Sequence, residues 1–159
     1  MAKTVERPVR FFPLMGGVAA RDKINIKDGV ILTWIDYSPE GYLNESDVAL
    51  FTDMDKDGKI TTEDAARSTQ EILDLLQNNE QIQASTLLSK GFTAAVLNRS
   101  LRNDQTNILE IGITASSQEK SSLEWTRAGN KSEKLIRIEK RHAGDLMTSG
   151  AVAIIEQSE

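Results

Sequence analysis

The residues of this chain that are best suited to chemistry are oxygen-bearing side chains in the twelve-residue stretch 53–64. They stand at positions 1, 3, 5, 9 and 12 of that stretch: Asp53, Asp55, Asp57, Thr61 and Asp64. Lys59, at position 7, would add its backbone carbonyl while its charged side chain points into solvent. Ca²⁺ takes about six to eight oxygen ligands at roughly 2.3–2.6 Å, and carboxylates from alternate positions of a coiling loop can surround it. The sequence therefore predicts that these six residues bind Ca²⁺, and it predicts no other cofactor.

The remaining residues of the stretch are typical of a folded calcium loop. Gly58 allows a sharp bend after Asp57 at no steric cost, and Ile60 can pack into a core. The pattern resembles the loop of the EF-hand superfamily, and in particular the dockerin-type variant, which ends in Asp. The resemblance covers the loop and the helix after it, and it implies calcium binding and nothing more specific. Asp64 is one methylene shorter than the usual Glu, so either the exiting helix lies closer to the ion or the contact is monodentate.

A metal-free acidic turn is the alternative interpretation of this stretch. Three Asp side chains crowded together would repel one another without a cation, and this repulsion would disfavour a compact loop. The electrostatic argument therefore favours the calcium site.

A second twelve-residue frame, 36–47, repeats part of the pattern. Its matching residues are Asp36, Ser38, Glu40, Gly41, Leu43, Asn44 and Asp47. Only Val48–Thr52 separates the two frames, which is too little for a full helix, and Pro39 is awkward at position 4. We favour a turn that leads into the N-cap of a helix, and the binding of a second ion stays open.

Helices on both sides must position the calcium loop. A polar residue at 44 or 46 can cap a short entering helix over 47–51, and a Thr at 61 or 62 can cap an exiting helix that runs to about residue 77. A third helix is expected from about 81 to 101, weakened by Gly91.

The ends of the chain have a different character. Residues 1–20 contain two of the three prolines and a Gly pair, which predicts an extended arm. The runs 23–27 and 30–35 flank Asp-Gly and predict a hairpin, although the second run could equally be a short buried helix. The last third predicts an antiparallel meander, with strands at 107–114, 122–127, 134–139 and 151–156.

The expected fold class is α+β: a helical N-terminal half with one EF-hand-like helix–loop–helix, followed by an antiparallel β-meander. Its segments are an arm with a first strand at 1–30, a helical segment at 31–103 and strands at 104–159. We expect the strands to pack with the helices as one compact domain.

Composition excludes several classes of function. The net charge of −5 is concentrated in residues 28–83, which carry −10, while the flanking segments carry +4 and +1. This pattern argues against nucleic-acid binding by overall charge. The chain has no cysteine, so disulfides, thiolate metal sites and thiol nucleophiles are excluded. No stretch is long enough to span a bilayer, and the apolar run 11–20 is broken by Pro and Gly, which favours an arm over a signal peptide.

No catalytic set stands out, so we expect no enzyme activity. His142 is the only histidine, and a turn position is its simplest interpretation. The basic residues of 131–141 alternate with aliphatic ones, as on the solvated face of a strand.

Three functions fit these observations. The first is a soluble, non-enzymatic protein with one structural Ca²⁺. The second is a subunit of a larger assembly, such as a virion, phage tail or secretion apparatus, that uses the arm and a calcium-stiffened surface for contacts. The third is a dockerin-like module that binds a protein partner. In each case we expect a protein partner or self-assembly and neither nucleic acid nor membrane, and the sequence does not separate a cytoplasmic location from a virion or a secreted assembly.

Overall fold

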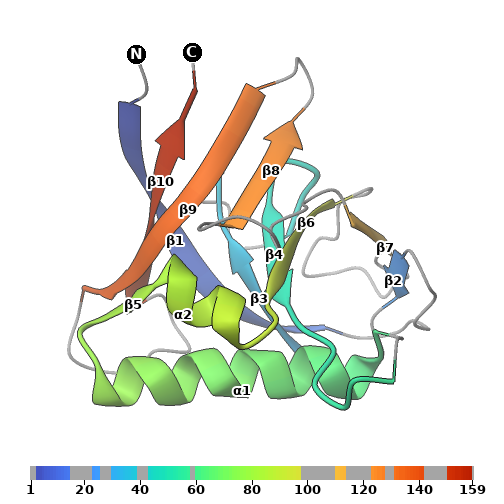
Figure 1. Cartoon of the computed structure of the whole chain (residues 1–159). Coiled ribbons are helices and arrows are strands. Elements are labelled where there is room, and N and C mark those ends of the chain that lie inside the picture. Colours follow the sequence, from blue (N-terminus) through green and yellow to red (C-terminus); the bar gives the residue numbers. More distant parts are fainter. Residues whose placement is uncertain are drawn as a thin grey trace.

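An antiparallel sheet of ten strands dominates the protein (Figure 1). The computed structural model describes residues 3–14, 23–25, 30–38, 43–57, 60–97, 110–113, 123–127, 131–141 and 150–158. The strands are β1 Lys3–Leu14, β2 Lys23–Asn25, β3 Val30–Ile35, β4 Val48–Phe51, β5 Gln81–Gln83, β6 Thr93–Leu97, β7 Glu110–Ile113, β8 Leu123–Arg127, β9 Lys131–Lys140 and β10 Ala151–Gln157. Two helices, α1 Thr62–Asn78 and α2 Ala84–Ser89, complete the described part of the chain.

The sheet is curled into a half-barrel. Its strand order is β2-β7-β6-β4-β3-β1-β10-β9-β5, and β8 pairs with β9 beside β5. The first strand therefore lies in the middle of the sheet, between β3 and β10. The curl brings β8 close to β6, although β8 pairs with β9 alone in the described part of the chain. Helix α1 runs across the lower end of the half-barrel in Figure 1.

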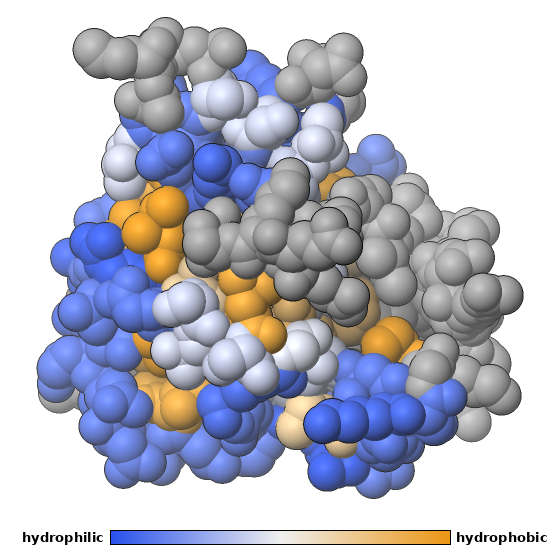
Figure 2. Space-filling view, viewed as in Figure 1, coloured by the Kyte–Doolittle hydropathy of each residue, from blue (hydrophilic) through white to orange (hydrophobic). Residues whose placement is uncertain are grey.

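Two apolar clusters lie on opposite faces of the sheet. Because successive side chains of a strand point to opposite faces, Val48 and Leu50 of β4 join the inner cluster while Ala49 and Phe51 join the outer one. Helix α1 contributes to the inner cluster through Ile72, Leu73 and Leu76. The exposed surface along the lower edge of Figure 2, where α1 lies in Figure 1, is mainly hydrophilic.

Helix α1 confirms the predicted exiting helix. Thr61 is its N-cap: the Thr61 hydroxyl accepts from the Asp64 backbone N–H at 3.2 Å, and the Asp64 carboxylate accepts from the Thr61 N–H. This capping box satisfies two backbone donors that the first turn would otherwise leave unpaired. The helix ends at Asn78, and Asn79 is extended.

The predicted helical N-terminal half is wrong. Strands make up about half of the structure, with 52% strand against 23% helix. The expected entering helix 47–51 is strand β4, whose four residues are all buried between β3 and β6. The sequence of a strand buried on both faces is a continuous apolar run without alternation, and so short a run is compatible with a helix as well as with a strand. The expected helix–loop–helix is therefore a strand–loop–helix.

The expected third helix, 81–101, is also wrong. It is divided into β5, α2 and β6. The break after α2 falls at Gly91, which has a φ of +87°. The position is also crowded, because a Cβ added to Gly91 would lie 3.0 Å from the Thr52 hydroxyl. Such a backbone conformation strongly favours glycine, so the helix ends here and the chain returns to the sheet.

The structure places the remaining segments as follows. Residues 3–14 of the expected arm form strand β1. The expected hairpin is absent from the described residues, because β2 pairs with β7 while β3 pairs with β1 and β4. The expected C-terminal strands are confirmed in position, and β8, β9 and β10 form an antiparallel meander. The strand at 110–113 instead pairs with β6 and β2. In the described part of the chain, no helix is long and apolar enough to cross a membrane.

Candidate metal centre

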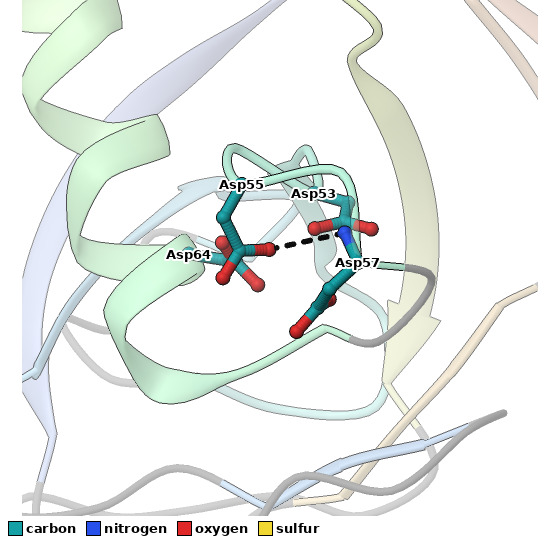
Figure 3. Close-up of side chains that lie close together, drawn as sticks. All are labelled: Asp53, Asp55, Asp57 and Asp64. Carbon is teal, nitrogen blue, oxygen red and sulfur yellow. Dashed lines mark hydrogen bonds between the residues drawn. The ribbon is translucent and has the colours of Figure 1, made fainter.

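Four aspartates meet where strand β4 passes into helix α1. Asp53, Asp55 and Asp57 lie in the loop after β4, and Asp64 lies in the first turn of α1 (Figure 3). One carboxylate oxygen from each lies within 4.8 Å of the others. Two ligands on opposite sides of one Ca²⁺ are at most about 5.2 Å apart, so all four oxygens can reach a common ion. The corresponding limit for Mg²⁺ is about 4.2 Å, so the smaller ion requires a tighter arrangement.

Asp64 closes the loop. Its side chain is buried, with 1% exposed. One carboxylate oxygen, Oδ1, accepts from the Met54 backbone N–H at 3.1 Å. The other, Oδ2, accepts from the N–H and the hydroxyl of Thr61, each at 3.0 Å. A carboxylate offers about four lone pairs, two on each oxygen, and the three hydrogen bonds use one on Oδ1 and both on Oδ2. Asp64 can therefore give a metal ion one lone pair, on Oδ1. Of the two arrangements open from the sequence, the monodentate contact therefore fits these bonds.

The three loop aspartates are crowded. Asp53 accepts from the Lys56 backbone N–H at 3.0 Å, and Asp55 accepts from the Asp57 backbone N–H at 3.3 Å. Lys56 has a φ of +58°, in the left-handed region, which tightens the turn between them. A hydrogen bond with the Asp53 side chain, together with desolvation and the neighbouring Asp57, raises the pKa of Asp55 to about 6. The site therefore holds more negative charge than its own donors neutralise, which is the condition that favours a bound cation.

Ser68 joins the start of the loop to the helix. Its buried hydroxyl accepts from the Thr52 backbone N–H at 2.9 Å, and it lies 3.1 Å from the Thr52 carbonyl and 2.6 Å from the Asp64 carbonyl. Thr52 follows the last residue of β4, and in place of a neighbouring strand the Ser68 hydroxyl bonds to its backbone groups. Sequence reasoning missed Ser68. The signal that could have found it is a pair of polar residues, Ser68 and Thr69, on the face of α1 that is otherwise apolar.

The other predicted loop residues are partly accounted for. Thr61 caps α1, and its hydroxyl is hydrogen-bonded to Asp64. Ile60 is half-buried and packs against the outer apolar cluster, as expected. Lys59 and Gly58 lie outside the described residues.

The second frame, 36–47, holds a turn together. Asp36 is fully buried and pairs with the Arg10 guanidinium at 2.6 Å. Asp47 accepts from the backbone N–H groups of Tyr37 and Asn44, each at 3.0 Å. Glu40 and Gly41 of this frame lie outside the described residues. Within the ranges that are described, the 53–64 loop is the one cluster of acidic groups able to hold a metal ion.

The basic residues of β9, and Arg141 just after it, are neutralised in part by ion pairs. Lys134 lies 3.6 Å from Glu124, Arg137 lies 2.5 Å from Glu139, and Arg141 lies 3.1 Å from Glu139. These contacts agree with the solvated strand face expected from the sequence. His142 lies outside the described residues.

Comparison with known proteins gives no relative: no family model matches the chain, and no curated protein or solved structure matches it.

Proposed function

We propose that the chain is a non-enzymatic protein in which the 53–64 loop binds one structural Ca²⁺. The observation that carries the proposal is the convergence of four carboxylates, three from the loop after β4 and one from the first turn of α1, within 4.8 Å. Oxygen ligands alone, without imidazole or thiolate, suit a hard cation. We assign Ca²⁺ rather than Mg²⁺ because Ca²⁺ accepts the irregular geometry of a coiling loop, whereas Mg²⁺ demands a near-ideal octahedron.

A structural role follows from the elements that carry the loop. All four residues of β4 are buried, and α1 buries Ala65, Ser68 and Ile72. A sensor opens by swinging one flanking element, and such a motion here would pull these side chains out of the core. An ion at this position would instead fix the angle between β4 and α1.

The two other hypotheses have less support. The assembly hypothesis relied on an extended N-terminal arm, and residues 3–14 lie inside the sheet. The dockerin-like hypothesis would gain from a second calcium loop, whereas Asp36 and Asp47 are engaged by Arg10 and by backbone N–H groups.

Isothermal titration with Ca²⁺ tests the proposal. We expect one equivalent to bind, Mg²⁺ to bind more weakly, and Asp57→Asn to weaken Ca²⁺ binding at least tenfold, because it removes a ligand charge. Glu63→Gln is the matched control: it removes the same charge one residue before Asp64, but Glu63 is exposed and outside the cluster. Equal affinities for the two variants, or no binding by the unmodified protein, would refute the site.

A further inference from the structure

An open groove lies beside the middle of strand β9. Strand β8 pairs with β9 as far as Leu135, and β5 pairs with it from Arg137 onward. Figure 1 shows β8 beside the upper half of β9 and β5 beside its lower half. The groove has a volume of about 300 Å³, and its lining comes from β5, the start of α2, β9 and β10. This volume is enough for a small ligand.

Ile136 gives the groove an apolar wall. The register between β9 and β10 shifts here, because Leu135 pairs with Ile155 while Arg137 pairs with Ile154. Ile136 lies between these two pairs as the extra residue of a β-bulge, and it has no partner on β5 or β8 either. A bulge interrupts the ladder and redirects a side chain. Ile136 is only half-buried and lines the groove, so an aliphatic side chain is available there to a ligand.

Glu156 is the charged group that the groove leaves without a partner. Glu156 and Lys134 are paired positions of β10 and β9, but Nζ of Lys134 lies 3.6 Å from Glu124 on β8. The other basic neighbour, Arg137, pairs with Glu139 at 2.5 Å. In the described segments no cation forms an ion pair with Glu156, which is half-buried and lines the groove. The row across β10, β9 and β8 therefore carries two carboxylates against one ammonium.

Two neutral side chains add hydrogen-bond acceptors. Gln83 ends β5, Ser85 lies in α2, and both are exposed and line the same groove. The Gln83 amide oxygen and the Ser85 hydroxyl can each accept a hydrogen bond. An ammonium group has three donors that rotate freely, whereas a guanidinium needs acceptors arranged in a plane. One carboxylate with separate neutral acceptors therefore suits an ammonium better than a guanidinium.

We propose that the groove binds a primary alkylammonium group, with the alkyl chain against Ile136 and the ammonium at Glu156. An exposed ion pair alone contributes little to binding, so the burial of the alkyl chain is needed as well. A lysine side chain and a free alkylamine share this chemistry. The groove uses no residue of the calcium loop, so the proposal is independent of Ca²⁺ binding.

Titration with butylammonium chloride, followed by NMR at the backbone amides of Ser85 and Ile136, tests this proposal. Sodium chloride holds the ionic strength constant, and Ca²⁺ is present so that the amine does not collect at the aspartates. We expect saturable shifts of both resonances. Glu156→Gln should weaken binding at least tenfold, because it removes the charge and keeps the shape of the side chain. Butanol, which has the same alkyl chain without the charge, should also bind at least tenfold more weakly.

A blocked tripeptide with lysine at its centre distinguishes the two sources of the ammonium group. Tighter binding of the peptide than of butylammonium would assign the groove to a lysine of a protein partner. Tighter binding of butylammonium would assign it to a free amine.

Glu45→Gln is the matched control, since Glu45 is an exposed carboxylate in the 36–47 turn and does not line the groove. This variant should bind butylammonium as the unmodified protein does. The proposal is overturned if the unmodified protein shows no saturable shifts, if Glu156→Gln and Glu45→Gln bind equally well, or if butanol binds as tightly as butylammonium. The butanol comparison uses the unmodified protein, so it decides the matter even where Glu156→Gln does not fold.

Discussion

Replacement of Ser68 by Ala tests how the loop is attached to the helix. In the native structure the Ser68 hydroxyl accepts from the Thr52 backbone N–H at 2.9 Å, and its own proton has the Asp64 carbonyl at 2.6 Å as the nearer acceptor. Both Ser68 and Thr52 are buried, with 0% and 4% exposed. The substitution therefore leaves the Thr52 N–H without an acceptor and out of reach of water.

The size of the effect follows from the Thr52 N–H, the one backbone donor that the substitution leaves without a partner. A buried polar group left without a partner costs about 1–3 kcal/mol. Ala is a better helix former than Ser by a few tenths of a kcal/mol, which offsets part of the cost. We expect a net loss of about 1–2 kcal/mol in the free energy of unfolding, or about 2–8 °C in melting temperature for a chain of this size.

Denaturant and thermal unfolding of Ser68→Ala, in chelator and in Ca²⁺, measure this loss. Ser85→Ala is the control, because Ser85 is exposed at the start of α2 and should change stability by less than about 0.5 kcal/mol. Ser68→Ala should also bind Ca²⁺ more weakly, since the start of the loop is no longer held against α1. If Ser68→Ala is as stable as Ser85→Ala, the hydroxyl does not hold the strand to the helix and our account of the loop is incorrect.

Three further predictions concern pH, the loop after α2 and the buried ion pair between Arg127 and Glu133. Because the pKa of Asp55 is raised from 3.8 to about 6, the folded protein holds this proton more tightly than the unfolded chain does, and the stability of the protein in chelator should fall as the pH rises from about 4 to 6. Calorimetry should show weaker Ca²⁺ binding at pH 5 than at pH 7. Equal affinities at the two pH values would contradict the crowding of the aspartates. Gly91→Ala should destabilise by about 1–3 kcal/mol, since Ala would adopt a φ of +87° with its Cβ 3.0 Å from the Thr52 hydroxyl, and an unchanged denaturation midpoint would show that this position has room. Glu133→Gln should cost about 3–5 kcal/mol by leaving Arg127 buried without its carboxylate, and a loss below 1 kcal/mol in urea unfolding would show that solvent reaches the pair.

Helix α1 could be predicted because its signals are local. A cap at Thr61, the partner of that cap at Asp64 and a helical apolar stripe all lie within one segment. The same holds for the acidic site: the spacing of its aspartates identified all four carboxylates that the structure brings together.

Strand β4 could not be predicted because its signals are not local. Its partners, β3 and β6, lie on either side of it in the sheet but are separated from it in the sequence by the 36–47 turn and by α1. Burial on both faces removes the alternation that would mark a strand. The hydrogen bond between Tyr37 and Glu133 was missed for the same reason, because these two residues are far apart in the sequence.

The position of β1 sets an order on folding. Its pairing with β10 joins Lys3 to Gln157, so the middle of the sheet forms between the first and last segments described. During synthesis β1 must wait for nearly all the other strands before this side of it can pair, while neighbours in sequence such as β8 and β9 can pair at once. Until then β1 exposes an unpaired edge, which makes the incomplete chain prone to aggregate. Loss of residues 151–157 alone would therefore remove an interior strand, β10, and separate β1 from β9, instead of removing a strand at the edge of the sheet.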